Sequence, residues 1–213
     1  MIANSRPRRL PEVLTEQELA ALVRQPNRRA PTGCRNLALL LCMARCGLRV
    51  GEALALEHRD TQGGQLTIRE GKGAKDRVVP LDPQTAQALD AWWEVRGRLG
   101  ANGRRVFVTI THRTTGRARI NGRELDTSTQ PGQPLSACYT RQMVARYAQK
   151  AGIEKRVHPH TLRHTAATTW LRQGFNTREV QELLGHASLV TTQVYTHVFP
   201  EELRAKMQGL TPV

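Results

Sequence analysis

The stretch GCRNLALLLCMARCGLRVGEALAL, residues 33–56, decides how this chain folds. Apolar side chains dominate its first part, which predicts a buried helix over about 33–46. Gly47 is expected to end that helix, because glycine readily adopts the left-handed conformation that closes helices. The remaining residues, 49–56, predict a short helix with one apolar side facing a core.

Further along the chain, helical spacing gives way to alternation. Residues 65–69 and 76–81 alternate around a glycine-rich turn at 71–75, which predicts an antiparallel hairpin. A short strand is expected at 106–108, and a polar, arginine-rich loop or flexible hairpin at 109–135. We therefore predict a mainly α protein with a small antiparallel β-sheet (α+β). The other expected helices start at the Thr15 capping box, at the Asp82 N-cap followed by Pro83, and at the Ser136 N-cap, or cover about 160–173, 177–184, 189–197 and 201–207.

The chain is strongly basic. Among its 213 residues, 32 Lys and Arg face 18 Asp and Glu, which gives a formal net charge of +14. Such a surplus favours a polyanionic partner, of which nucleic acid is the usual one, although a basic chain can also simply be soluble. Most of the cations are arginine, whose planar fork can grip a phosphate with two hydrogen bonds.

The same sequence argues against the secreted and membrane classes. Its basic start, MIANSRPRRLPEVL, lacks the apolar core of a secretory signal. The longest apolar run, 37–44, is far too short to cross a bilayer. The four cysteines form no CxxC pair, and Cys42 and Cys46 lie on the apolar helix, where small buried thiols are expected. We therefore expect a reduced, cytoplasmic protein.

Two motifs in the first half of the chain could carry chemistry. Arg49 opens the short helix and Glu52 follows one turn later, so the carboxylate could hold the guanidinium in place. Taken alone, a surface arginine with a capping glutamate explains this pair better. Lys72 stands at the tip of the glycine-flanked turn, where an ammonium group could donate a proton to a leaving oxygen. Taken alone, that motif is better explained as an ordinary solvated turn.

Two motifs in the second half add histidines and a phenol. His160 and Arg163 share one helix face, and an imidazole can act as a base near neutral pH. His160 and His164 also have the spacing of metal ligands, but the glutamate of HExxH is missing and no third ligand is indicated. We therefore expect no metal, and we interpret His164 as a structural core histidine. Tyr195 follows His186 by nine residues; a phenol is a competent nucleophile when cations stabilise its oxyanion, although a tyrosine often only packs in a core.

Together, these motifs resemble the successive blocks of a known family. The segments GLRVGEALAL, GKGAKDRVVPL, HPHTLRHTAATTWL and LLGHASLVTTQVYTHV follow one another with that family's ordinary spacing. Their order of Arg, Lys, His-x-x-Arg, His and Tyr is similar to the catalytic set of the tyrosine recombinases, the phage integrase family, and in particular of its XerC/XerD-like members. The resemblance covers about 12–205 and is weakest at 109–135. Each motif alone is unspecific, and their order gives the resemblance its weight.

The resemblance implies a site-specific DNA recombinase or integrase that cuts and rejoins DNA through a 3′-phosphotyrosine intermediate. Tyr195 would attack the phosphodiester, His160 would accept its proton, and Lys72 would protonate the leaving 5′-oxygen. The charge on the phosphate would be balanced by protein cations, so neither a metal nor another cofactor is implied. The implied catalytic residues are Arg49, Lys72, His160, Arg163, His186 and Tyr195, with Glu52 supporting Arg49.

The resemblance also implies a domain plan. A basic tail at 1–14 precedes a catalytic domain at 15–198, which contains the basic loop or insertion at 109–135. The segment 199–213 is expected to be exchanged between protomers of a tetramer on double-stranded DNA, with packing onto its own chain as the alternative. The family's separate N-terminal core-binding domain is expected to be absent. DNA contacts are expected from Lys75, Arg77, Arg113, Arg117, Arg119 and Arg141, although a disordered insertion would explain 109–135 equally well.

Three other functions compete with a recombinase. A catalytically silent DNA-binding relic or regulator would bind DNA without cutting it, but all the expected polar positions are present. A type IB topoisomerase-like enzyme would relax supercoiled DNA that lacks a defined site. A histidine-rich metal hydrolase would lose its activity to a chelator.

Overall fold

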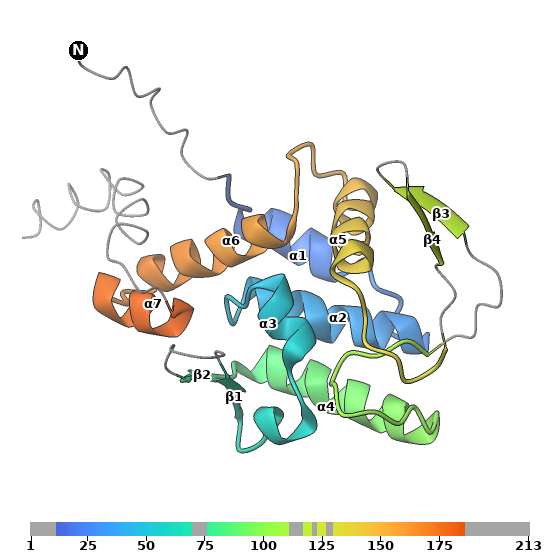
Figure 1. Ribbon diagram of the computed structural model, residues 1–213. Helices are drawn as coiled ribbons and strands as arrows, with labels where there is room; N and C mark the ends of the chain where they lie inside the picture. Colours follow the sequence, from blue (N-terminus) through green and yellow to red (C-terminus); the bar gives the residue numbers. More distant parts are fainter. Residues whose placement is uncertain (1–11, 70–75, 111–116, 121–122, 127–129, 186–213) are drawn as a thin grey trace, which may run out of the picture.

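The computed structural model describes residues 12–69, 76–110, 117–120, 123–126 and 130–185. Within these ranges the chain is mainly helical with small antiparallel hairpins, which confirms the predicted fold class (Figure 1). The predicted helices at 189–197 and 201–207 lie outside the described residues. None of the helices in the described ranges has the length and apolar character of a membrane span.

Helix α2 (Pro31–Ala44) forms the centre of the core. It lies between α4 (Pro83–Arg98) and α6 (Pro159–Arg172), and every residue from Arg35 to Ala44 is buried (Figure 1). The helix ends at Ala44, slightly before the predicted position, and Gly47 then turns the chain with a φ of 65°. The predicted buried thiols are confirmed, and burial raises the pKa of Cys46 to about 12.

The predicted capping signals set the starts of three helices. Thr15 forms a capping box with Glu18 at the start of α1 (Glu16–Val23). Asp82 accepts backbone hydrogen bonds at the start of α4, and Ser136 does so at the start of α5 (Ala137–Lys150). Each side-chain oxygen satisfies an amide that has no partner inside its helix, which explains why these positions were readable from the sequence.

The predicted hairpin is confirmed by strands β1 (Gln65–Ile68) and β2 (Arg77–Pro80). The register pairs Leu66 with Val79 and Ile68 with Arg77, so these residues share one face of the hairpin. That face is buried, and α3 (Val50–Ala55) and the 3₁₀ turn η1 (His58–Thr61) precede it in the chain. The sequence predicts α3 but not η1.

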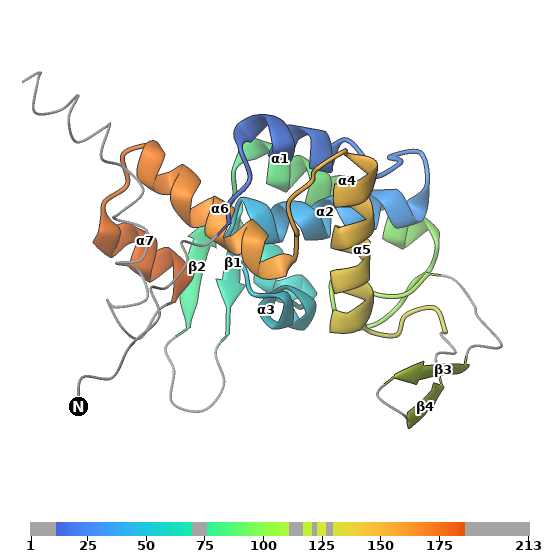
Figure 2. The same ribbon diagram turned by 90° about the horizontal axis from the view of Figure 1, so that it is seen from above.

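A second hairpin lies at the end of the molecule opposite α7 (Thr177–Leu184). It consists of β3 (Arg117–Ile120) and β4 (Arg123–Asp126), and both views place it beyond α5 (Figures 1 and 2). It lies within 109–135, the segment predicted as a loop or flexible hairpin.

The predicted strand at 106–108 is wrong. Only isolated bridges occur in this segment, between Glu57 and Arg105 and between Val108 and Pro134. The reason is that side chains of α4 occupy the backbone carbonyls. Trp92 Nε1 donates to the Val106 oxygen at 2.9 Å, and other carbonyls of the preceding loop accept from Arg96. With these acceptors taken, the segment bends at 106–107 and crosses the core without forming a ladder.

Candidate active site

Glu52 lies at the centre of the site. It stands in the first turn of α3, where its Oε2 accepts a hydrogen bond from the backbone N–H of Arg49 at 2.8 Å. Its Oε1 accepts from Arg49 Nη1 at 2.6 Å. Glu52 therefore caps the helix and holds the arginine side chain at the same time, so both interpretations of this motif describe real contacts.

Arg163 approaches the same carboxylate from α6. Its Nη1 lies 3.5 Å from Glu52 Oε2 and donates to the Gly47 carbonyl at 2.7 Å. Its Nη2 donates to the Leu184 carbonyl at 2.7 Å, at the C-terminal end of α7. Arg163 is only 4% exposed, whereas the side chain of Arg49 is 40% exposed. Of these two implied catalytic arginines, Arg49 is therefore the more open to a ligand.

Arg77 is the third arginine on this carboxylate. Its Nη2 lies 2.8 Å from Glu52 Oε2 and its Nη1 lies 3.3 Å from Oε1, an approach to both oxygens. Its Nε donates to the Leu183 carbonyl at 2.9 Å. A DNA contact is predicted for Arg77, but its side chain is only 8% exposed and lies between α3 and the end of α7. We call Arg49, Arg77 and Arg163 around Glu52 the arginine cluster.

Among the described residues, the arginine cluster brings three guanidinium groups to one carboxylate. Burial alone would raise the pKa of Glu52, but hydrogen bonds from Arg77 and Arg49 outweigh it and hold that pKa below its usual value. Glu52 is therefore a carboxylate at neutral pH. Three guanidinium groups gathered at one place are a setting in which an anion such as a phosphate can be bound.

Two of the predicted histidines, His160 and His164, lie in the first half of α6. His158 is the N-cap and accepts from the Thr161 N–H at 3.2 Å, and the exposed His160 ring lies 6.1 Å from the His158 ring. Burial, followed by the charges of His160 and Arg163, lowers the pKa of His164 to about 4. His164 is thus neutral at pH 7, as suits the structural role predicted for it. Across the described part of the chain, no three His, Cys, Asp or Glu side chains gather as a metal site would require.

The other predicted site residues are spread along the chain. Arg141 is exposed on α5, away from the contacts of the arginine cluster. The register of the second hairpin sets Arg117 opposite Asp126 and Arg119 opposite Glu124. The predicted residues that lie outside the described ranges are Lys72, Lys75, Arg113, His186 and Tyr195.

Two glycines allow the elements to come this close. Gly47 has a φ of 65°, and a Cβ atom there would lie 2.8 Å from the Trp170 ring and 3.0 Å from Leu184. Gly185 closes α7 in the left-handed conformation, and a Cβ there would lie 2.8 Å from Arg77 Nη1. The end of α7 therefore packs directly against the arginine cluster, one residue before the predicted His186.

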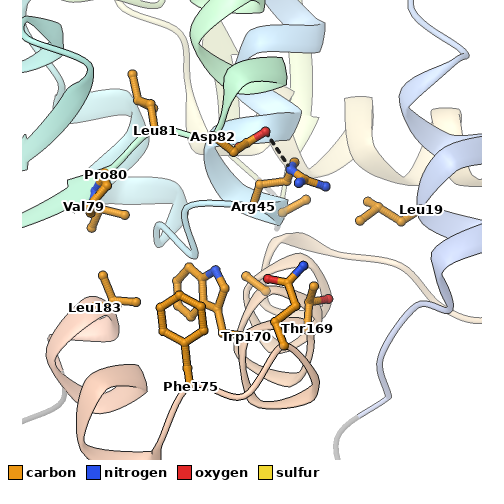
Figure 3. A pocket seen from close by; sticks show the side chains of 13 residues that line it. Leu19, Arg45, Val79, Pro80, Leu81, Asp82, Thr169, Trp170, Phe175 and Leu183 are labelled. Atoms are coloured by element: carbon orange, nitrogen blue, oxygen red, sulfur yellow. Dashed lines mark ion pairs between the residues drawn. The ribbon is translucent and has the colours of Figure 1, made fainter.

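A pocket of about 280 Å³ lies between β2, α6 and α7 (Figure 3). An ion pair between Arg45 Nε and Asp82 Oδ1, at 3.0 Å, lies on one side of it. Phe175 is 41% exposed at this pocket, which is high for so large an apolar side chain. Most of the lining is apolar, including Leu19, Val79, Leu81, Trp170 and Leu183.

Solved structures share this fold. The crystal structure of XerA recombinase matches 99% of this chain and 68% of its own, with a TM-score of 0.75 and 31% sequence identity. The structure of XerH site-specific recombinase bound to palindromic difH substrate, a post-cleavage complex, matches 97% of this chain and 55% of its own, with a TM-score of 0.72 and 28% identity.

Sequence comparison gives the same result. The profile of the "Phage integrase family" matches residues 12–202. Tyrosine recombinase XerC of Pelotomaculum thermopropionicum is 38% identical over 199 residues, which cover 92% of this chain and 60% of the relative. Tyrosine recombinase XerA of Thermococcus kodakarensis is 36% identical over 200 residues, which cover 93% of this chain and 62% of the relative. The chain thus spans about 60% of the length of these relatives. It belongs to the phage integrase family, and its fold is that of the catalytic domain of Xer-type tyrosine recombinases.

Proposed function

We propose that this chain is the catalytic part of a site-specific DNA recombinase that cuts and rejoins DNA through a 3′-phosphotyrosine bond. The observation that carries the proposal is the arginine cluster: Arg49 and Arg163 reach one carboxylate from two different helices, so that their guanidinium groups lie close together. Relatives over nearly the whole chain are named as tyrosine recombinases, and one related structure is described as a post-cleavage DNA complex.

In the proposed reaction, the oxygen of Tyr195 attacks the scissile phosphorus and the bond to the 5′-oxygen breaks. The phenolic proton passes to His160, and the leaving 5′-oxygen takes a proton from Lys72. A 5′-hydroxyl of the same or a partner strand then attacks the phosphotyrosine and releases Tyr195. The covalent bond conserves the energy of the phosphodiester, so rejoining needs no nucleotide triphosphate.

The arginines would act on the phosphate in the transition state. Negative charge grows on its non-bridging oxygens, so donors that are already in place stabilise this state more than the ground state. Arg49 would meet the phosphate from the open side and Arg163 from the buried side, as their side-chain exposures of 40% and 5% suggest. His186 would add a further hydrogen bond.

The proposed partner is double-stranded DNA that carries recombination sites, met in the cytoplasm. Helix α5 packs against α3, which carries Glu52, and it has no acidic residue. Arg141, Arg146 and Lys150 are exposed on α5, so this helix offers a basic surface near the site. We propose that it contacts the DNA backbone, together with Lys75 and the basic residues Arg113, Arg117 and Arg119 of 109–135.

We further propose that the protein works as a tetramer on DNA, with 199–213 of one protomer packed on its neighbour. The pocket in Figure 3 suits that segment, because Phe175 and Trp170 leave apolar surface there and the segment carries Leu203, Met207 and Leu210. The change Phe175→Glu should weaken assembly on DNA in analytical ultracentrifugation while the free protein stays folded. Assembly equal to that of the wild type would contradict this assignment of the pocket.

The cutting activity can be tested without knowing the site. A pool of nicked duplexes with randomised arms lets the short 5′-hydroxyl fragment diffuse away after cleavage, so a covalent protein–DNA adduct accumulates. We expect an adduct that survives SDS, a single recovered sequence class, and a phosphorylated peptide at Tyr195 by mass spectrometry. The Tyr195→Phe variant should bind the pool but form no adduct.

Two outcomes would contradict the proposal. Binding to the pool without an adduct in the wild-type chain would indicate a silent DNA-binding protein. Relaxation of supercoiled plasmid with no sequence class recovered would indicate a topoisomerase-like enzyme.

A further inference from the structure

Arg77 has the contacts of a structural joint. It starts strand β2, and the register pairs it with Ile68 on the buried face of the hairpin. Its guanidinium reaches both oxygens of Glu52 at 2.8 and 3.3 Å, and its Nε donates to the Leu183 carbonyl at 2.9 Å. One planar group thus joins three elements, the hairpin, α3 and the end of α7, that are far apart in the sequence.

Arg77 bonds to the same two groups that position Arg49 and Arg163, namely Glu52 and the end of α7. Glu52 accepts from Arg49 Nη1 at 2.6 Å, so the position of the carboxylate fixes that of Arg49. The last turn of α7 is gripped twice, because Arg163 Nη2 donates to Leu184 O at 2.7 Å beside the Leu183 contact. A displacement of Arg77 would therefore also displace Arg49 and Arg163.

We propose that Arg77 is a positioning residue for this chemistry, one that aligns Arg49 through Glu52 and fixes the end of α7 against Arg163. The inference rests on the proposed function, and it replaces the DNA contact expected for Arg77. Because Arg77 is 9% exposed and its donors lie on Glu52 and Leu183, it acts through its neighbours and does not touch the phosphate itself.

A lysine cannot replace this arrangement. Its ammonium is a compact point charge, whereas the guanidinium fork can bond a carboxylate with two parallel N–H groups and a carbonyl with a third. Arg77→Lys keeps a positive charge beside Glu52 but cannot meet the carboxylate and the Leu183 carbonyl in the same geometry. Arg77→Ala removes both contacts.

The test measures adduct formation on the recovered nicked duplex at saturating protein, together with DNA affinity. For Arg77→Ala we expect the rate to fall by about 100-fold, the cost of a misplacement of about 1 Å in a catalytic group. Arg77→Lys should form the adduct at roughly one tenth of the wild-type rate, because only part of the geometry is lost. DNA affinity should stay unchanged in both variants.

Arg96→Lys is the matched control. Arg96 is 6% exposed and donates to carbonyls of the loop after α4, so the variant loses comparable buried contacts away from the site. We expect it to lower stability but not the adduct rate per folded molecule. A rate for Arg77→Ala equal to that of the control, or a loss of DNA affinity in place of rate, would overturn the inference.

A second measurement judges Arg77 without any activity. Hydrogen exchange at the amides of residues 183–185 should become about tenfold faster in Arg77→Lys, since a hydrogen bond from a charged donor is worth roughly that factor. The amide of Val144, inside α5, should keep its rate. Unchanged exchange at the end of α7 would overturn the inference, whereas a wild-type chain that forms no adduct would overturn the proposed function instead.

Discussion

Two buried arginines in this protein have opposite surroundings. Arg35 in α2 is 3% exposed and Arg163 in α6 is 4% exposed, so burial does not distinguish them. Arg35 donates to the Val108 carbonyl at 2.9 Å, to the Tyr139 hydroxyl at 2.7 Å and to the Asn36 side chain at 3.1 Å. These described partners are all neutral, whereas Arg163 shares one carboxylate with two other arginines.

The difference separates a structural from a functional arrangement. Arg35 joins α2 to α5 and to the segment at Val108. Burial lowers its pKa, while Tyr139 and Tyr147 work against that shift. Its environment asks for no further ligand. The arginine cluster instead gathers three guanidinium groups at one described carboxylate, and such a concentration of like charges costs stability unless it serves to bind an anion. Convergence of several cations on one anion, and not burial, marks the site.

The largest expected effect is on activity at the arginine cluster. Arg163→Lys should lower the rate of adduct formation by about 100- to 1,000-fold, as the loss of one preorganised donor to a transition-state oxygen typically does. Adduct yield against time on the nicked duplex measures this. A rate close to that of the wild type would contradict the proposed contact between Arg163 and the phosphate.

The next effect is on stability at Arg35. Arg35→Met should lower the free energy of unfolding by about 2–3 kcal/mol, because hydrogen bonds from a charged donor to buried acceptors are lost. Urea denaturation measures this. Adduct formation per folded molecule should not change; a large loss of rate would mean that the contrast between the two regions is false.

A smaller effect should come from inorganic phosphate. At ten times its dissociation constant, phosphate should raise the free energy of unfolding by about 1.4 kcal/mol if it binds the arginine cluster in the folded state alone. The general stabilisation by excluded salts is present in every variant. The response should therefore persist in Arg35→Met and shrink in Arg163→Lys; equal responses would contradict binding at the cluster.

The last effect concerns pH. The folded-state pKa of His164, about 4, lies below its usual 6.5, so the unfolded chain takes up the proton first as the pH falls. The free energy of unfolding should be at its plateau above pH 6.5 and should decline as the pH drops towards 4. His158, whose pKa is lowered by burial and by His160, adds to this decline.

Denaturation at several pH values between 7.5 and 5 measures this effect. We expect His164→Gln to flatten most of the decline and His158→Gln to flatten less of it. An unchanged slope in His164→Gln would contradict the assigned pKa. This pH effect belongs to one of the two regions alone: His164 adjoins Arg163, whereas the described partners of Arg35 include no histidine.

The sequence predicted what depends on neighbours along the chain. Thr15, Asp82 and Ser136 bond to amides two or three residues ahead, so each cap was visible as a local pattern. Glu52 lies one helical turn from Arg49, so their pairing was visible for the same reason. Such contacts follow from helix geometry and need no knowledge of the fold.

The role of Arg77 could not be predicted in the same way. Its partners, Glu52 and Leu183, are 25 and 106 residues away, and only the folded chain brings them together. One signal was present: in the strand RVVP, Arg77 alternates with Val79 and so shares the buried face. The strand prediction at 106–108 is wrong for a related reason, because Trp92 and Arg96 take carbonyls that a strand would have used.

Gly47 has a consequence for how this protein would fail. Its carbonyl anchors Arg163 at 2.7 Å, and its α-carbon faces Trp170 and Leu184, the residues that bind α6 to α7. The same few atoms therefore serve as a wall of the core and as a mount for the site. Heating that loosens the packing around Gly47 should abolish activity directly, so thermal inactivation should occur at or below the melting temperature. Gly47 must therefore be kept when the site is engineered, because a larger side chain there would clash with Trp170 and Leu184.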